Sequence, residues 1–316
     1  MVKRLMDSVM YRLGYSYRYG SYRKHFVSQE KETYCGKRIL SDAEANDFIA
    51  KKVAEGKPFM AARMGGHEIR TTYHHHLTNK PYSEQITHGM FTFAGFFPSD
   101  EKNLTRFAEL MFSSIKEVDV MGIWFYEGEE EMCQKYCPDA EFVYPKGLEP
   151  YYFPENPWSQ HLAGKKVLVI HPFEDSIKQQ YANNRTKLFA TAPKVLPEFE
   201  LKTIKAVQSV AGIGSGSGFA TWFDAYDYMC NQMTKTDYDV AIIGAGAYGF
   251  PLASFAKQQG KQAIHMGGAT QLLFGVLGQR WMDRDDVNHY FNDSWKRPSP
   301  HETPEKAQIV ENACYW

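Results

Sequence analysis

The chain has 316 residues, of which 43% are hydrophobic and 15% aromatic, and a net charge of −1. The apolar content excludes an intrinsically disordered protein, and the balanced charge argues against nucleic acid as a partner. No segment approaches the roughly 20 consecutive apolar residues that a membrane-spanning helix needs, so an integral membrane protein is not expected. A chain of this length forms one large or two small domains.

The chain contains five cysteines, and Cys133 and Cys137 are the only close pair. Without a second pair or a histidine at ligand spacing, a zinc site is not expected. Reduced thiols fit a cytoplasmic protein. Residues 1–13 lack the uninterrupted apolar core of a secretory signal, because Asp7 and Arg12 break it.

Residues 1–40 form a basic, tyrosine-rich N-terminal extension, and apolar residues at helical spacing predict a short amphipathic helix near its start. One interpretation is peripheral contact with the anionic inner face of a membrane. The interpretation that we favour is a helix packed on the domain or on a second copy in a homo-oligomer, followed by a mobile arm.

From residue 41 the pattern alternates between helix and strand. A capping box at Ser41 and Glu44 begins a helix that stops at Gly56. The pattern then predicts a strand over 58–62, a helix over 100–116 and a strand over 118–123. Five prolines interrupt residues 127–160, which we interpret as either a covering loop or a seam between two halves.

The second half continues this alternation. It predicts strands over 165–170, 202–210, 240–243 and 261–266, with helices over 176–190 and 219–233. Continuous apolar strands between helices indicate an α/β fold, a Rossmann-like parallel sheet with helices on both faces. This domain is expected over 41–290, and residues 291–316 are expected to form a C-terminal tail. Ligands of such sheets bind outside the carboxyl ends of the strands.

Gly244, Gly246 and Gly249 form a G-x-G-x-x-G pattern between a strand and a helix, and Tyr248 lies inside it. This pattern is typical of phosphate binding, because the glycines admit a phosphate to the amides at a helix N-terminus. A dinucleotide would also need an acidic residue about 20 positions later. His265 to Gly268 stand there instead, so a phosphate-bearing ligand is favoured over NAD(P), and plain turn geometry stays open.

Two other motifs give weaker signals. Gly212 to Gly218 open a helix and could form a second anion cradle, but a flexible loop explains them as well. The consecutive histidines His74, His75 and His76 cannot all face one metal ion from a regular element, so we expect exposed or partly packed rings.

Arg63, Gly65, Gly66, His67 and Glu68 directly follow a predicted strand. The planar guanidinium group of an arginine can pair with phosphate oxygens, and a glutamate beside them can bind a hard divalent ion. The structural alternative is an Arg63–Glu68 ion pair that only ties down the loop.

His171 and His265 also follow strands, and either could act as a general acid or base. Hydrogen bonding to the backbone explains each histidine equally well. Gly267 and Gly268 stand beside His265, and the pair suggests that the backbone approaches a ligand there.

The segment from Ala62 to Glu68 resembles the Arg-Phe-Gly-Asp-Gly-Glu signature of bacterial GT-D fold glycosyltransferases, and the similarity extends over about residues 41–282. The segments Asp239–Gly246 and Gly260–Gly268 resemble the part of that family that completes a nucleotide-sugar site. The resemblance implies a Rossmann-like enzyme of polysaccharide and glycoprotein glycan assembly.

In that family, the Asp-x-Glu part of the signature helps to hold a divalent metal and the sugar nucleotide. Glu68 matches the glutamate and Arg63 the arginine, whereas Gly66 replaces the aspartate and His67 a glycine. Losing one carboxylate weakens a site for Mn²⁺ or Mg²⁺. Either His67 contributes, another acid takes part, or the metal dependence has been lost.

The sequence therefore predicts a glycosyltransferase of bacterial surface polysaccharide biosynthesis that moves a sugar from a nucleotide sugar to a glycan or lipid-linked acceptor. Glu68, His265 and His171 are the candidate catalytic residues, with Glu68 as the metal ligand. The predicted substrate-binding residues are Arg63, Gly65, Gly66, His67, Gly244, Gly246, Tyr248, Gly249, Gly267, Gly268 and Gln271. An NAD(P)-dependent oxidoreductase and a non-catalytic partner of a polysaccharide synthesis or export complex are the alternatives.

Overall fold

The fold was analysed in a computed structural model that describes residues 32–78, 80–282 and 284–316. The amphipathic helix and most of the basic extension predicted over residues 1–40 therefore lie outside the described residues. The last residues of that extension form a small antiparallel hairpin of β1 (Thr33–Tyr34) and β2 (Lys37–Arg38).

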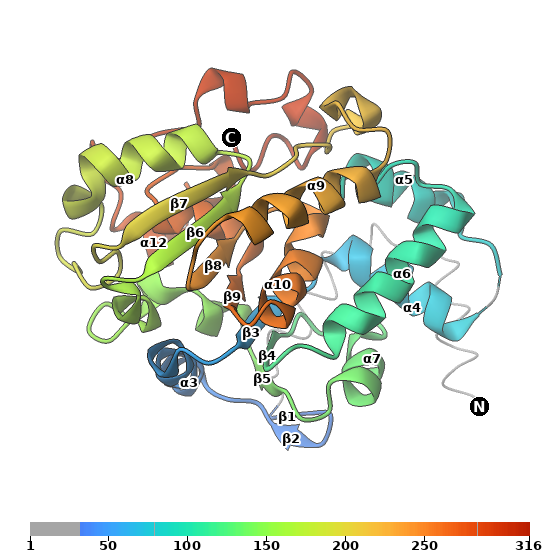
Figure 1. The fold of residues 1–316 in the computed structure, drawn as a ribbon, viewed down its shortest axis with the longest axis horizontal. Coiled ribbons are helices and arrows are strands. Elements are labelled where there is room, and N and C mark those ends of the chain that lie inside the picture. Colours follow the sequence, from blue (N-terminus) through green and yellow to red (C-terminus); the bar gives the residue numbers. More distant parts are fainter. Residues whose placement is uncertain (1–31, 79, 283) are drawn as a thin grey trace.

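One seven-stranded sheet runs through the molecule in the order β5-β4-β3-β9-β8-β6-β7, and each pair of neighbouring strands is parallel (Figure 1). Its strands are β3 (Phe59–Arg63), β4 (Val120–Gly122), β5 (Glu141–Val143), β6 (Lys166–His171), β7 (Glu200–Lys205), β8 (Val240–Ile243) and β9 (Gln262–His265). The predicted α/β class is confirmed.

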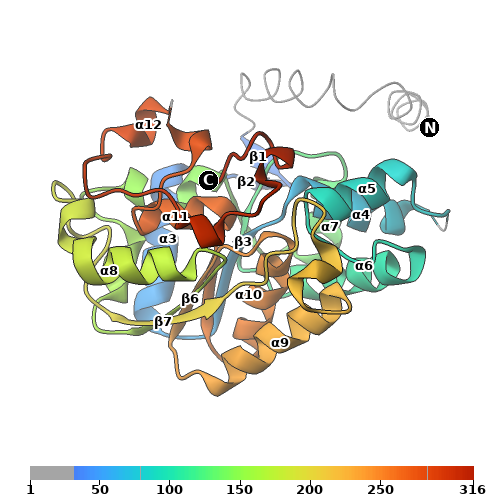
Figure 2. The same cartoon turned by 90° about the horizontal axis from the view of Figure 1, so that it is seen from above.

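Helices cover both faces of the sheet (Figures 1 and 2). One face packs against α4 (Gly66–Leu77), α5 (Glu84–Thr92), α6 (Glu101–Ile115), α7 (Glu129–Tyr136), α9 (Trp222–Lys235) and α10 (Gly249–Gln258). The other face packs against α3 (Asp42–Glu55), α8 (Glu174–Leu188), α11 (Thr270–Leu273) and α12 (Asp285–Asn288). The fold is therefore a Rossmann-like three-layer structure.

The central strand β3 shows why two apolar cores form. Met60 and Ala62 belong to the core on the α6 side, and Phe59 and Ala61 belong to the core on the α3 side. Successive side chains of a strand point to opposite faces, so a wholly apolar strand is stable only when both faces are covered.

Local signals set several element boundaries. Ser41 and Glu44 form the expected capping box of α3, and Gly56 ends that helix in the left-handed conformation with φ of 67°. Asp100 caps α6 through its side chain, which accepts a hydrogen bond from the Asn103 amide. These features confirm two predicted helices, because each satisfies backbone groups that a helix end leaves unpaired.

Residues 127–160 are more regular than the prolines indicated. They contain α7, the edge strand β5 and three short 3₁₀ turns. Neither α4 nor α5 was predicted from the sequence, and β7 ends at Lys205 instead of continuing to residue 210. The helix α4 begins after Gly65 without a side-chain cap, so it lacks the start signal that marked α3.

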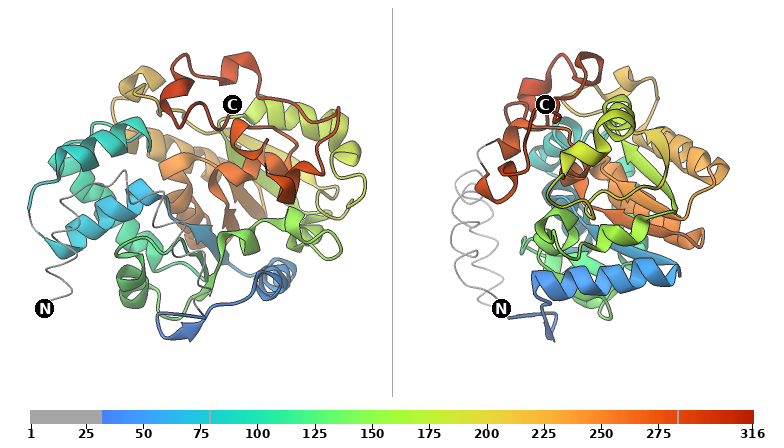
Figure 3. Two further views of the ribbon diagram at one scale, coloured as in Figure 1. Left: turned by 180° about the vertical axis from the view of Figure 1, so that it is seen from behind. Right: turned by 90° about the vertical axis from the view of Figure 1, so that its left-hand side faces the viewer.

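The C-terminal residues 291–316 pack against the α/β domain. Trp295, Val310 and Cys314 of this segment are buried, and Figure 3 shows the red C-terminal segment lying along the domain. In the part of the chain that the structure describes, no helix is long and apolar enough to cross a membrane.

Candidate functional site

The two halves of the chain meet at the centre of the sheet, between β3 and β9. From β3 the chain continues to β4 and β5 on one side, whereas β9 is reached through β6, β7 and β8 on the other side (Figure 1). The chain leaves β3 for α4 on one face of the sheet and leaves β9 for α11 on the other face. Open α/β sheets bind ligands in the crevice that such connections leave outside the carboxyl ends of the strands. Arg63 ends β3 and His265 ends β9.

Arg63 is held at this edge through one nitrogen of its guanidinium group, which leaves the two terminal nitrogens available to a ligand. Its Nε donates a hydrogen bond to the carbonyl oxygen of Met266 (3.0 Å), and its Cζ lies 5.1 Å from the centroid of the Trp124 ring. Its terminal amino groups make no hydrogen bond or ion pair to any residue that the structure describes, and they are not sealed from solvent. This leaves two donors in the geometry that phosphate and carboxylate groups favour.

Glu68 lies in the first turn of α4, and its carboxyl group folds back over Gly65, the N-cap residue. A Cβ on Gly65 would lie only 2.2 Å from Glu68 Oε2. Burial raises the pKa of Glu68, while its own backbone amide and the positive charge of Arg63 act in the opposite direction. Arg63 and Glu68 thus interact electrostatically but do not form the ion pair that was the structural alternative for this loop.

Gly66 and His67 do not complete a metal site with Glu68. A Cβ on Gly66 would lie 3.1 Å from Tyr126 Cζ, so the tyrosine ring covers the place where the GT-D signature has its aspartate. The His67 ring lies over Gly89 of α5 and stacks on Phe93, with ring centroids 5.2 Å apart. His67 is therefore directed toward α5.

Across the described residues, three potential metal ligands come together at Asp175, His301 and Glu302. This group does not include Glu68, and the Glu302 carboxylate accepts a hydrogen bond from the Asp175 amide at the start of α8 (2.9 Å). The motif itself offers a cation one carboxylate, so further ligands would have to be substrate oxygens and water. The divalent metal stays a prediction.

The three glycines of the turn after β8 have different surroundings. A Cβ on Gly244 would lie 2.6 Å from His171 Cδ2, and one on Gly249 would lie 2.1 Å from His265 Cε1. The two histidine rings occupy the space that a Cβ would need, so packing alone explains the glycines at these two positions. Gly246 is exposed, has a φ of 52° and would meet no atom within 4 Å. It is the glycine of this turn that a phosphate could approach.

His171 and His265 are buried behind this turn, with 3% and 4% of their surfaces exposed. Burial lowers the pKa of each ring to about 3. His171 Nδ1 accepts a hydrogen bond from the Phe173 amide (3.0 Å), whereas His265 Nδ1 donates to the Ile243 carbonyl (3.0 Å). Both rings are therefore neutral groups with defined tautomers.

Of the remaining predicted residues, some lie beside Arg63 and the others are covered or buried by protein side chains. Gly267 lies against Arg63, since a Cβ there would lie 2.1 Å from Arg63 Nη2. The ring of Tyr315, from the C-terminal segment, covers Gly268. Gln271 is buried and donates a hydrogen bond to the Tyr315 carbonyl (3.0 Å). Tyr248 stacks on Trp222 with ring centroids 4.6 Å apart, so its ring belongs to the core.

Three residues at this edge were not anticipated from the sequence: Trp124, Glu149 and Tyr315. Trp124 follows β4 and lies beside the guanidinium group of Arg63. Glu149 follows β5, is partly buried and interacts electrostatically with Arg63. A glutamate directly before Pro150, in a segment expected to be irregular, carries no pattern that identifies it. The position of Trp124 directly beyond a predicted strand was the one available signal.

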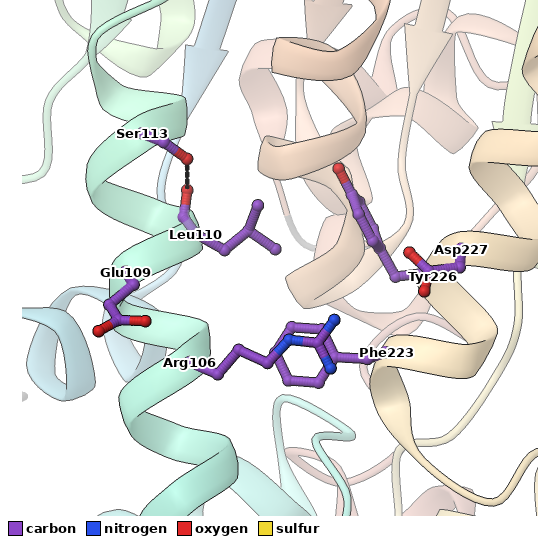
Figure 4. Close-up of a pocket in the computed structure, with 7 residues that line it drawn as sticks. All are labelled: Arg106, Glu109, Leu110, Ser113, Phe223, Tyr226 and Asp227. Atoms are coloured by element: carbon purple, nitrogen blue, oxygen red, sulfur yellow. Dashed lines mark hydrogen bonds between the residues drawn. The ribbon is translucent and has the colours of Figure 1, made fainter.

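A cavity of about 250 Å³ lies elsewhere, between α6 and α9 (Figure 4). It is lined by Arg106, Glu109, Leu110, Ser113, Phe223, Tyr226 and Asp227. None of these residues follows a strand. The guanidinium group of Arg106 packs on the Phe223 ring, with Arg106 Cζ 3.7 Å from the ring centroid. This cavity is separate from the groups gathered around Arg63.

Comparison with protein families, with characterised proteins and with solved structures found no match to this chain.

Proposed function

We propose that the edge between β3 and β9 binds the diphosphate of a nucleotide sugar, and that the protein transfers the sugar to a glycan or lipid-linked acceptor in bacterial surface polysaccharide biosynthesis. The observation that carries this proposal is the unpaired, accessible guanidinium fork of Arg63 at the carboxyl ends of β3 and β9, where the chain leaves the two strands toward opposite faces of the sheet. Ligands of open α/β sheets bind at such points.

The chemistry of transfer explains why a cation is needed there. As the bond between sugar and diphosphate breaks, negative charge develops on the leaving diphosphate. A fixed arginine and the free amides of a helix N-terminus stabilise that charge without reorganising during the reaction. Arg63 supplies the cation, and the turn at Gly246 opens the helical segment leading into α10. Glu68, whose carboxyl group interacts electrostatically with Arg63, would orient the donor sugar.

A divalent cation, when bound, would add positive charge beside the same diphosphate. Glu68 is the residue of the motif that would hold it. The terminal amino groups of Arg63 can pair with phosphate oxygens directly, so the proposal requires Arg63 and does not require the metal.

The surroundings of the glycine turn favour a nucleotide sugar over a dinucleotide. A dinucleotide site uses an acidic residue at the end of the next strand to hold a ribose. That strand is β9, which ends at His265. Residues 265–271 contain no aspartate or glutamate. All five cysteines are free thiols, which supports a reducing compartment, so we place the reaction in the cytoplasm.

The test is a thermal-shift screen of nucleotide sugars, with and without Mn²⁺, and of NAD(P) as the competing class. A ligand present at 100 times its Kd stabilises the folded protein by about 2.7 kcal/mol. We expect a shift with a nucleotide sugar in the wild type and in Arg106→Ala, and no shift in Arg63→Ala. Arg106 is a suitable control because it also packs on an aromatic ring, away from this edge.

A shift produced by NAD(P) and by no nucleotide sugar would favour the oxidoreductase. Donor binding without turnover of any acceptor would favour the non-catalytic partner. A nucleotide-sugar shift that is equal in Arg63→Ala and wild type would remove Arg63 from the site.

A further inference from the structure

Glu149 is a carboxylate at this edge to which the resemblance assigned no role. It joins two consecutive 3₁₀ turns, Pro145–Leu148 and Pro150–Tyr152, after β5. Its neighbour Leu148 is fixed, because the Leu148 carbonyl accepts a hydrogen bond from Trp158 Nε1 (2.9 Å) and the Leu148 side chain is fully buried. The backbone that carries Glu149 is therefore rigid.

One oxygen of the Glu149 carboxylate is held by a hydrogen bond, and the other accepts none from the described residues. Tyr151 donates its hydroxyl proton to Glu149 Oε2 (2.5 Å). The same hydroxyl oxygen lies 3.5 Å from the carbonyl oxygen of Ala269, just after β9. Oε1 makes no hydrogen bond to any residue within the described ranges and is not sealed from solvent. An oriented carboxylate with one accessible oxygen can accept a proton from a bound molecule.

Glu149 is close enough to Arg63 for their charges to interact, but the two side chains form no ion pair. Burial raises the pKa of Glu149 above its usual value, and the Tyr151 hydroxyl, Arg63 on β3 and Arg284 beside α12 each act in the opposite direction. The negative charge of Asp286 on α12 raises this pKa slightly. Neither arginine forms an ion pair with Glu149. The separation from Arg63 exceeds ion-pair distance, as required if a reacting sugar lies between the cation and a base.

We propose that Glu149 is the general base that takes the proton from the acceptor hydroxyl group; this inference rests on the proposed glycosyl transfer. The acceptor oxygen forms a bond to C1 of the donor sugar as its proton passes to Glu149 Oε1. The bond from C1 to the diphosphate oxygen breaks, and its electron pair leaves with the nucleoside diphosphate beside Arg63. A single displacement of this kind inverts the configuration at C1.

The other candidates suit this role less well. His171 and His265 are 3% and 4% exposed, and burial lowers the pKa of each ring to about 3, so they are weak and inaccessible bases. Glu68 is folded back over Gly65 at the start of α4. Glu149 combines a fixed orientation with an accessible oxygen.

The experiment measures donor binding by calorimetry and transfer across pH for Glu149→Gln and Glu149→Asp. The glutamine side chain of the first variant retains an oxygen that can accept the Tyr151 hydrogen bond, so we expect the site to fold. Unchanged affinity for the donor would show that it has folded. We expect Glu149→Gln to lower kcat by 10²- to 10⁴-fold, the usual contribution of a general base. Glu149→Asp is expected to restore part of that loss.

The pH profile separates a catalytic role from a structural one. The wild type is expected to lose activity at low pH as Glu149 is protonated, and Glu149→Gln to lose that dependence. Tyr151→Phe should move the acidic limb to higher pH and Asp286→Asn to lower pH, because the Tyr151 hydroxyl lowers and the Asp286 charge raises the pKa of Glu149.

Normal donor binding together with wild-type kcat in Glu149→Gln would overturn the assignment while leaving the proposed function intact. An unchanged acidic limb in Glu149→Gln, or retention of configuration in the product, would overturn it as well. Failure of the wild type to bind any nucleotide sugar would overturn the proposed function and this inference with it.

Discussion

Arg63 and Gly267 fit together so closely that the guanidinium group occupies the space where any other residue at position 267 would place its Cβ. That Cβ would lie 2.1 Å from Arg63 Nη2. Gly267 has a φ of 62°, a conformation that glycine adopts readily. The loop after β9 therefore positions the cation at the end of β3.

This contact predicts that Gly267→Ala displaces Arg63 and weakens donor binding at least tenfold, measured by calorimetry with a nucleotide sugar. Gly56→Ala is a matched control for backbone strain, because Gly56 ends α3, has a φ of 67° and would place its Cβ with no atom within 4 Å. Equal losses of donor affinity in the two variants would mean that backbone strain, and not displacement of Arg63, is responsible.

Glu129 predicts a pH-dependent stability in the loop that carries Trp124. Glu129 is fully buried, and its Oε2 accepts hydrogen bonds from the amides of Trp124 (2.9 Å) and Tyr126 (3.3 Å). Burial raises its pKa from 4.5 to about 7. The folded protein therefore keeps this proton at pH values where the unfolded chain loses it.

Because the folded pKa is the higher one, this contribution to the free energy of unfolding is fully present below pH 4.5 and is lost by about pH 7. The loss amounts to about 3 kcal/mol. Glu129→Gln should remove it, so denaturant unfolding of variant and wild type should diverge as the pH rises. Parallel stability curves between pH 4.5 and 8 would show that Glu129 has an ordinary pKa.

The buried position of His265 predicts a fixed tautomer. Its Nδ1 donates to the Ile243 carbonyl, and burial lowers its pKa to about 3. Nitrogen-15 NMR of the histidine side chains should show His265 neutral and protonated at Nδ1 throughout pH 5–8. Titration of this ring near pH 6.5 would restore His265 as a candidate base.

The fold was predictable because strong local signals agree with it. The capping box at Ser41, the start of the helix near Asp100 and the apolar strands before Arg63 and His171 all lie where the sequence placed them. The site was only partly predictable. Arg63 and Gly267 could be found because each directly follows a strand, and the sheet brings such residues to one edge.

The sequence could not predict how the glycine turn is filled. Gly244 and Gly249 match a phosphate-binding pattern, but His171 and His265 pack against them. Such contacts depend on strands that are distant in the chain. Glu149 was missed for the same reason, since its relation to Arg63 exists only after β5 and β3 join one sheet.

The most direct test of the account is calorimetric titration of the wild type and Arg63→Ala with the nucleoside diphosphate of the donor, in the presence of a chelator. The loss of even one charged hydrogen bond costs roughly 1.5–3 kcal/mol, so we expect the Kd to rise by at least about 10-fold in the variant. Equal affinity in the two proteins would contradict the claim that Arg63 holds the diphosphate.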